Sequence, residues 1–294
     1  MKGVGMSELS SWLQSSIKNY CSNSPENSIH MAPGEKVWGE PLVGFSSGAD
    51  PLYRTIQSNI GEFYLSPLEI FVRTFPEIGI SADQLTVISW VLPQSAATKA
   101  DNRKESTLPS ERWAKAKHYG EAFNVSLRKH LVYILRNAGF EAVAPVLAPF
   151  WGMKTSKRYG MCSNWSERHA AHISGLGTFG LCDGLITPVG KAVRCGSVVA
   201  RIALPPTPRP YTHHNEYCLF HSHGTCGKCI KKCPAGALSE RGHDKNKCAD
   251  HLKAALKYVK EHYGIESDVC GLCQVGVPCE SSIPRAGNII AEAV

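Results

Sequence analysis

The sequence predicts a mixed α/β (α+β) domain over residues 1–204, followed by a small cysteine-rich domain over residues 205–294. Three observations support this division. A strand-like run, a long amphipathic helix and a second strand-like run follow one another between residues 85 and 147, an order typical of α/β domains. A proline-rich stretch, Leu204–Tyr211, is incompatible with a helix or a central strand and marks the boundary. Eight of the twelve cysteines lie beyond it, between Cys218 and Cys279.

Each element is predicted from its own residues. The run "LTVISWVLP" (85–93) is apolar and rich in β-branched residues, which favours a buried strand. Apolar residues recur at three- and four-residue steps from 110 to 137, with Ser110 as a candidate N-cap and Gly139 just past the end, so we expect a long helix there. Further strands are expected at 141–147 and on both sides of a turn at Pro188–Gly190. A last amphipathic helix is expected at 247–262.

Composition indicates a globular protein, with 43% hydrophobic and 19% charged residues. No apolar run approaches the ~20 residues that a membrane helix needs, and the N-terminal stretch lacks the apolar core of an export signal. We therefore expect a cytoplasmic protein without a membrane partner. Because that compartment keeps thiols reduced, twelve cysteines point to metal binding rather than to disulfides.

The spacing of three tail cysteines is typical of ferredoxins. The segment "CGKCIKKCP" (226–234) matches the end of the C-x2-C-x2-C-x3-C-P run that holds a 4Fe–4S cluster. His223 stands where the first cysteine of that run is expected, and imidazole replaces thiolate in some clusters. Cys218 is the other candidate, because the residues between Cys218 and Cys226 can form a loop that returns to the same metal.

The number of cysteines decides between these ligands. Two cubane clusters need eight ligands, and using His223 would leave one thiol idle. The cysteine before proline ligates the second cluster in two-cluster ferredoxins. We therefore expect a ferredoxin-like domain with two 4Fe–4S clusters, one held by Cys218, Cys226, Cys229 and Cys279 and the other by Cys233, Cys248, Cys270 and Cys273. Zinc on the two C-x2-C pairs is the alternative, but it would leave four cysteines unused.

The net charge of +7 raises the question of a nucleic-acid partner. A 4Fe–4S cluster with four thiolates carries about −2, so two clusters would reduce +7 to roughly +3. We interpret the excess of Lys and Arg as a solvated surface, with lysines in "KCIKKC" and "KNKC" close enough to the cluster thiolates to offset their charge. Nucleic acid is thus a possible partner but not the favoured one.

A glycine-rich segment, "SGLGTFG" (174–180), imitates the dinucleotide fingerprint through Gly175, Gly177 and Gly180. That fingerprint needs a preceding strand, a following helix and an acidic residue about twenty positions later. Here a helix precedes the glycines, a turn and a strand follow, and no acidic residue occurs between Asp183 and Glu216. A nicotinamide site is therefore disfavoured. A tight turn in a packed core and a loop that cradles another ligand both remain open.

These residues together resemble a known family. The segment "ERHAAHISGLGTFGLCDGLITPVG" (167–190), followed by a strand and a double-cluster tail, resembles the epoxyqueuosine reductase and reductive dehalogenase superfamily. It is most similar to the short members described as 4Fe–4S double-cluster proteins, which "EPLVGFSSGADPLY" (40–53) also fits. The resemblance implies an N-terminal domain similar to flavin-binding nitroreductases that holds cobalamin, with Gly175, Gly177 and Gly180 beside the corrinoid.

The resemblance implies an oxidoreductase in which an external donor, such as ferredoxin or flavodoxin, feeds electrons through two clusters to cobalamin, which reduces a small-molecule substrate. Three alternatives stand beside it: a tRNA reductase of the epoxyqueuosine type, a non-catalytic electron carrier that reduces a partner's corrinoid, and a flavin-dependent reductase. A carboxylate that acts as proton donor in the epoxide branch is missing from the segment 161–164. Cys162 is the candidate donor in its place, because an ordinary thiol pKa of ~8.5 keeps it mostly protonated; a structural cysteine is the alternative reading.

The remaining chemistry-bearing side chains are predicted to be structural. His169 and His172 lie one helical turn apart without a third ligand nearby, so we expect core or surface histidines. Cys182 and Cys195 are expected to be small buried hydrophobes.

Overall fold

The computed structural model describes residues 5–286. Its helices are α1 (Met6–Asn23), α2 (Pro51–Ile60), α3 (Pro67–Thr74), α4 (Ala96–Lys104), α5 (Glu111–Asn137), α6 (Glu167–Ile173), α7 (Leu219–His223), α8 (Lys228–Lys231) and α9 (Lys245–Tyr263). Its strands are β1 (Leu42–Ser47), β2 (Leu85–Pro93), β3 (Ala142–Val143), β4 (Met153–Ser156), β5 (Gly160–Ser163), β6 (Thr178–Phe179), β7 (Leu185–Ile186), β8 (Val193–Arg201), β9 (Leu238–Ser239) and β10 (Gly242–His243). Among these residues no helix is both long and apolar enough to cross a bilayer.

A four-stranded antiparallel sheet, in the order β1-β2-β8-β3, forms the centre of the fold. The predicted strand at 85–93 is β2, which pairs along its whole length with β8 and is buried from residue 85 to residue 92. The two strands that flank the long helix in sequence, β2 and β3, both pair with β8 and so lie on either side of it. The mixed α/β class is thus confirmed, with an antiparallel sheet.

The strand predicted at 141–147 is much shorter than expected. Only Ala142 and Val143 pair with β8, and a 3-10 turn follows at Pro145–Leu147. Proline has no backbone N–H to donate to a neighbouring strand, so Pro145 ends the pairing. The prediction of two strands around the turn at 188–190 is correct, but β7 pairs with β6 whereas β8 enters the main sheet.

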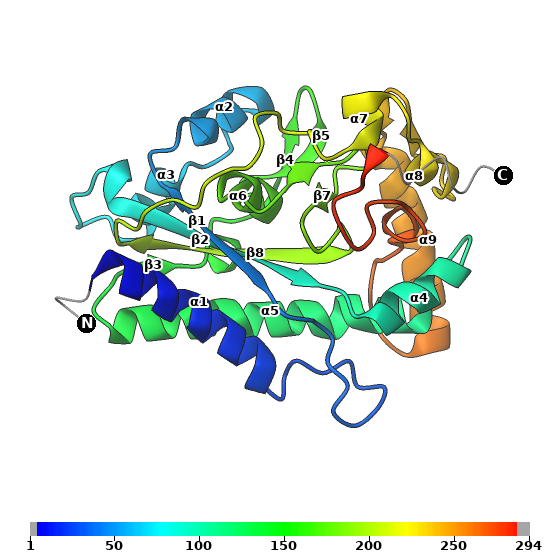
Figure 1. Cartoon of the computed structure of the whole chain (residues 1–294), viewed down its shortest axis with the longest axis horizontal. Coiled ribbons are helices and arrows are strands. Elements are labelled where there is room, and N and C mark those ends of the chain that lie inside the picture. The colour runs from blue at the N-terminus through cyan, green and yellow to red at the C-terminus, as the bar shows by residue number, and fades with distance from the viewer. Residues whose placement is uncertain (1–4, 287–294) are drawn as a thin grey trace.

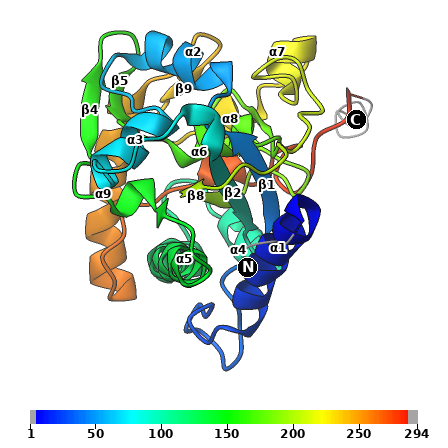
Figure 2. The same cartoon turned by 90° about the vertical axis from the view of Figure 1, so that its left-hand side faces the viewer.

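Helices cover both faces of this sheet, and each face has its own apolar core (Figures 1 and 2). On one face, α1 and the long α5 pack against Ile88, Trp90 and Leu92 of β2. On the other face, α3 and α6 pack against Leu85 and Val87. Because alternate residues of a strand point to opposite faces, burial on both sides explains the unbroken apolar run of β2.

Helix α5 agrees closely with the prediction. It spans 27 residues, Ser110 caps its N-terminus by accepting a hydrogen bond from the Trp113 backbone N–H, and Gly139 adopts φ +87° just past its end. Gly120 allows close packing in the middle of the helix, because a Cβ there would lie 2.5 Å from the Trp38 ring. The helix begins beside the cysteine-rich tail and runs along the sheet away from it (Figure 1).

The cysteine-rich tail packs against the first part of the chain. Residues 202–217, which include the proline-rich stretch, contain no helix or strand, as predicted. The predicted tail helix is α9, which ends at Gly264 with φ +68°. Arg103 of α4 donates to Glu280 at 2.5 Å, and the Tyr263 hydroxyl donates to the Pro109 carbonyl at 3.1 Å. The division into domains at residue 204 stays a prediction.

Candidate functional site

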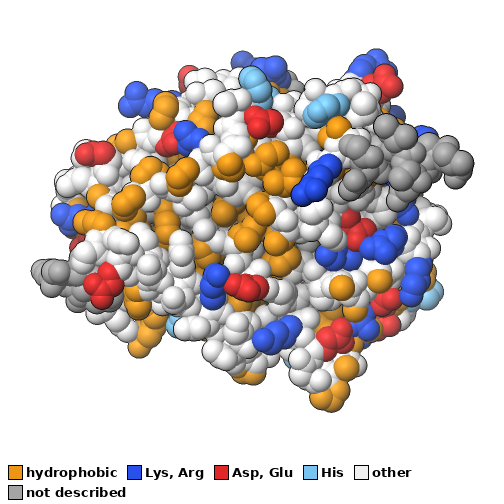
Figure 3. Space-filling model, viewed as in Figure 1, with side chains coloured by type: hydrophobic (Ala, Val, Ile, Leu, Met, Phe, Trp, Pro, Cys, Tyr) orange, Lys and Arg blue, Asp and Glu red, His pale blue; other side chains and the backbone are white. Residues whose placement is uncertain are grey.

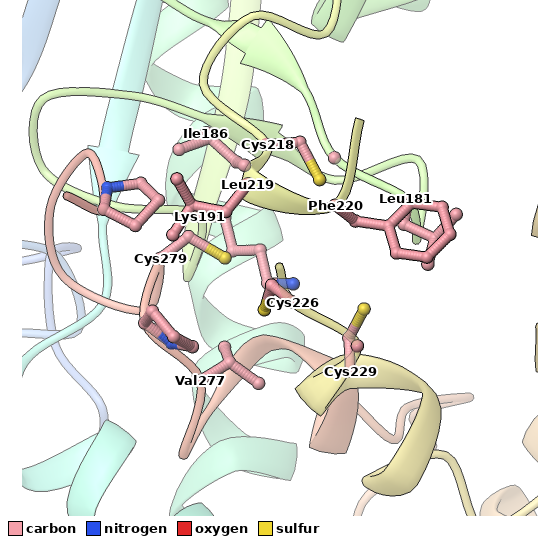
Figure 4. Close-up of a pocket in the computed structure, with 14 residues that line it drawn as sticks. Leu181, Ile186, Lys191, Cys218, Leu219, Phe220, Cys226, Cys229, Val277 and Cys279 are labelled. Atoms are coloured by element: carbon pink, nitrogen blue, oxygen red, sulfur yellow. The ribbon is translucent and has the colours of Figure 1, made fainter. Parts of the chain in front are cut away.

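Four of the predicted ligands surround one pocket, which we call the thiol pocket (Figure 4). Its cysteines are Cys218, Cys226, Cys229 and Cys279, and its other walls include Gly180, Leu181, Ile186, Lys191, Leu219, Phe220 and Val277. Cys218 precedes α7, Cys226 lies in the loop before α8, Cys229 lies in α8, and Cys279 lies in the last loop. Segments 61 residues apart in the sequence (279 − 218) thus bring together the four side chains assigned to the first cluster.

His223, the competing ligand, is exposed and does not line the thiol pocket. Its Nδ1 atom lies 2.7 Å from the Ser222 hydroxyl. The Cys218 side chain is buried and lines the pocket. The position in the pocket and the count of ligands therefore both favour Cys218 over His223 as a ligand.

The other four cysteines form a second thiol set beside α8 and α9. Cys233 follows α8, Cys248 lies in the first turn of α9, and Cys270 and Cys273 flank the short 3-10 turn at Leu272–Gln274. Burial, and secondarily the charges of Cys248 and Cys233, raise the pKa of Cys270 to about 11. Cys270 thus lies within electrostatic reach of two other members of this set. Within residues 5–286, no three His, Cys, Asp or Glu side chains converge on a single metal-ion position.

Cys182 is buried in an apolar cluster, as predicted, and it also has polar contacts that were not predicted. Cys273 packs against this cluster, and the Cys182 sulfur lies 3.3 Å from the Lys191 ammonium. The Cys273 contact and the Lys191 charge hold the pKa of Cys182 well below its usual range despite burial. These contacts could not be predicted because Cys273 is distant in sequence. Cys195 does follow its prediction: it is buried, and burial raises its pKa to about 12.

Lys191 lines the thiol pocket, and the sequence analysis did not single it out. Its side chain is buried and points into the thiol pocket (Figure 4). Burial by itself lowers the pKa of this ammonium, but the thiolates of Cys182, Cys279 and Cys273 raise it above its usual range. Position 191 belongs to no sequence motif. The one available signal was its place directly after the predicted turn at 188–190.

The three glycines of the "SGLGTFG" segment lie in two different environments. A Cβ at Gly175 would lie 2.7 Å from the Pro208 carbonyl oxygen, and one at Gly177 would lie 2.3 Å from the Ile186 carbonyl oxygen. Close approach to the chain's own backbone therefore accounts for both of these glycines. Gly180 instead lines the thiol pocket. The assignment of these glycines to a corrinoid stays a prediction.

Cys162 lies half-buried on β5, in the ribbon formed with β4. The ammonium of Lys245, the first residue of α9, lies 3.5 Å from its sulfur. His172 is a core side chain, one of the two outcomes expected for it, and its Nδ1 lies 2.7 Å from the Gly177 carbonyl oxygen. His169 is half-buried, and its ring packs between Tyr64 and Phe179.

The fold and these thiols define a class: an antiparallel α/β protein whose C-terminal tail gathers cysteines into one pocket and one neighbouring set. No family model matches the sequence. Over 119 residues the chain is 31% identical to epoxyqueuosine reductases of Bacillus anthracis and Bacillus cereus. The aligned part is 38% of this chain and only 29% of each relative.

Solved structures of related name share the fold of this chain. An epoxyqueuosine reductase with a tRNA-Tyr stem loop matches with a TM-score of 0.52 at 15% identity, over 94% of this chain and 66% of that one. The Bacillus subtilis epoxyqueuosine reductase matches with a TM-score of 0.51 at 15% identity, over 96% of this chain and 68% of that one. A catabolic reductive dehalogenase matches with a TM-score of 0.51 at 14% identity, over 85% of this chain and 31% of that one. The expected similarity to the epoxyqueuosine reductase and reductive dehalogenase superfamily is thus confirmed.

Proposed function

We propose that this protein is an iron–sulfur oxidoreductase with two 4Fe–4S clusters in its C-terminal tail. The observation that supports this most directly is the thiol pocket, where Cys218, Cys226, Cys229 and Cys279 stand around a common space. The donor set is four thiolates, the ligands that 4Fe–4S clusters take. Cys233, Cys248, Cys270 and Cys273 hold the second cluster in this proposal.

The chain's own residues shield and hold these clusters. Leu181, Ile186 and Val277 line the thiol pocket with apolar surface, which limits access of water to the thiolates. An external donor such as ferredoxin or flavodoxin supplies electrons, and a small molecule receives them. The similarity to the superfamily supports a reductase, and cobalamin, when bound, supplies low-valent cobalt chemistry at the substrate.

The described residues fit the clusters better than they fit cobalamin. The donor set of the thiol pocket matches what a cluster requires. By contrast, the Cβ positions of Gly175 and Gly177 face backbone carbonyls of Pro208 and Ile186, so these glycines leave no open cradle for a corrinoid ring. Cobalamin therefore enters the proposal through similarity to the superfamily, and no role in its reaction is assigned to Cys162.

Metal analysis after anaerobic expression with cobalamin supplied tests the proposal. We expect about eight irons and eight sulfides per chain, with the visible and EPR spectra of 4Fe–4S clusters. Cys226→Ser and Cys279→Ser should each lose about four irons, whereas Cys21→Ala, at a cysteine buried far from the tail in the α1 core, should keep eight. Zinc in place of iron, or loss of iron in the Cys21 control alone, would contradict the assignment. Near-stoichiometric cobalt would support cobalamin, and its absence would leave an electron carrier or a flavin enzyme.

A tRNA substrate is the second candidate, because one matching structure is that of an epoxyqueuosine reductase with a tRNA stem loop. The net charge of +7 is compatible with it. On the face shown in Figure 3, however, Lys and Arg side chains are scattered, with Asp and Glu side chains between them, over a largely uncharged surface. Binding of a tRNA anticodon stem loop measured between 50 and 200 mM salt decides the matter, since contacts to phosphates weaken steeply with salt. A flat salt dependence would count against this candidate.

A further inference from the structure

Lys191 is buried among the cysteines, and no carboxylate of residues 5–286 pairs with its ammonium. The Lys191 residue is 3% exposed. Among the described residues 5–286, no Asp or Glu forms an ion pair with it; its ammonium lies 3.3 Å from the Cys182 sulfur instead. Burying an ammonium without a compensating charge is costly. The site around Lys191 must therefore supply negative charge in the functional protein.

The backbone on either side fixes Lys191 to the cysteine tail. The preceding turn is closed by mutual backbone hydrogen bonds between Thr187 and Gly190, at 3.1 and 2.9 Å. The Lys191 backbone N–H then donates to the Cys279 carbonyl at 2.8 Å. Gly190 has φ +85°, and a Cβ there would lie 2.1 Å from the Glu280 carbonyl oxygen. The turn thus docks so closely on the last cluster loop that the lysine keeps a fixed position relative to Cys279.

The side chain lies between the two groups of cysteines. Lys191 lines the thiol pocket with Cys229 and Cys279, and its ammonium lies 3.3 Å from the sulfur of Cys182. Cys182 belongs to a buried cluster that also contains Cys229, and Cys233 and Cys273 of the second thiol set pack against this cluster. A nearby carboxylate does not cancel its charge, because Glu280 accepts from Arg103 at 2.5 Å and from the Gly276 N–H at 2.6 Å. The negative charge that faces Lys191 is therefore sulfur-borne.

A cluster in this position is sensitive to such a charge. With four thiolates a 4Fe–4S cluster carries about −2, and reduction adds one further negative charge. A buried ammonium stabilises the more negative state, because the low dielectric of the interior strengthens the attraction. Exposed lysines nearby, such as Lys231 on α8, act through solvent and are screened.

We propose that Lys191 is the shared counter-charge of the two clusters and raises the reduction potential of both. This inference rests on the proposed function, since it requires iron–sulfur clusters at the eight cysteines. Lys191 is a positioning residue in this role: it touches no substrate, and it acts on the clusters through its charge.

The test compares Lys191→Met, Lys191→Arg and the matched surface variant Lys231→Met. Each purified holoprotein is titrated with a reductant at fixed potentials, and cluster reduction is followed by EPR. We expect Lys191→Met to lower the equilibrium constant for reducing each of the two clusters by tenfold or more, which is 59 mV for one electron; a change at one cluster alone would contradict the shared role. Lys191→Arg should stay close to wild type, and Lys231→Met should change the constant less than twofold.

Each outcome decides the proposal. Unchanged potentials in Lys191→Met with full iron content would overturn it and leave the proposed function intact. A wild-type protein without iron would refute both. If Lys191→Met folds, as judged by circular dichroism, but loses iron, retention of iron by Lys191→Arg supports the need for a charge. Loss of iron from both variants would show that side-chain shape matters and not charge, and would overturn the proposal.

Discussion

The Arg128 Nε atom of α5 lies 3.1 Å from the Glu167 carboxylate of α6, and the Arg128 side chain is only 2% exposed. The same guanidinium reaches Glu121 at 3.0 Å. Glu167 also accepts a hydrogen bond from the Ser197 hydroxyl of β8. This network joins two helices of opposite layers through the sheet, and it holds the start of the helix that leads into the glycine-rich segment.

Breaking this network should destabilise the fold strongly. We expect Arg128→Met to lower the free energy of unfolding by about 3–5 kcal/mol, because Glu167 is then left as a buried, unpaired charge. Urea unfolding followed by circular dichroism measures the effect. The exposed pair Lys257–Glu261 provides the control, and Lys257→Met should change stability by less than about 1 kcal/mol. A double Arg128→Met/Glu167→Met variant should recover part of the loss; no recovery would contradict the charge argument.

Stability should fall in mild acid because of His169. Burial, followed by the charge of Arg168, lowers the pKa of His169 to about 3, against an ordinary value near 6.5. A group whose pKa is lowered on folding favours the fold fully above pH 6.5, and that contribution is lost as pH falls from 6.5 toward 3. The loss reaches at most about 1.4 kcal/mol per pH unit.

The comparison of wild type with His169→Phe isolates this effect. Urea midpoints at pH 7.5 and pH 5.5 should differ less in the variant than in wild type, since the variant has no imidazole to protonate. His213→Gln, at an exposed histidine, should keep the wild-type difference. An unaltered pH dependence in His169→Phe would show that His169 is not the titrating group.

The docking of the 187–190 turn predicts a sharp contrast between two glycines with the same backbone conformation. Gly190 has φ +85° and meets the Glu280 carbonyl, whereas Gly139 has φ +87° with no atom within 4 Å of its Cβ position. Gly139→Ala should cost about 1 kcal/mol for its backbone alone. Gly190→Ala should cost clearly more and also lower the iron content, because the turn must move away from Cys279. Equal stability and equal iron content in the two variants would contradict the described docking.

Trp113 should link the stability of α5 to that of the tail. This side chain is 4% exposed, it packs with Val259, Val269 and Val275, and a Cβ at Gly271 would lie 2.2 Å from its Nε1. We expect Trp113→Ala to lower the free energy of unfolding by about 3–5 kcal/mol. Tyr133→Ala, at a 64% exposed position of the same helix, should change it by less than about 0.5 kcal/mol. Thermal unfolding of both variants checks the difference.

Local patterns predicted β2, α5 and α9 well, but α1 to α4 and β1 were not predicted, and the strand expected at 141–147 has only two residues. Helix α5 could be predicted from neighbouring residues: its apolar stripe, the Ser110 cap and Gly139 past its end. The apolar run of β2 is a local pattern of the same kind. Nothing local says that β8 lies between β2 and β3, because strand pairing joins residues more than fifty positions apart.

The same limit applies to the site. Cysteine spacing and ligand count singled out eight residues, and the structure brings four of them around one pocket. The contacts of Lys191 and Cys182 could not be predicted, because a buried lysine has no periodic signature. The partners of Lys191, Cys273 and Cys279, lie in a loop that comes much later in the sequence.

The hydrogen bond from the Asn102 side chain to the Cys270 carbonyl, together with the packing of Trp113 on Gly271, has a consequence for the order of assembly. The surfaces of α4 and α5 stay uncovered until a segment more than 150 residues later in the sequence has been synthesised. Closing such distant contacts is slow compared with forming the local helices. During synthesis the N-terminal layers can therefore collapse first, with Trp113 uncovered until the tail arrives. Under the proposed function, iron bound at that late stage fastens the last loop against α4 and α5.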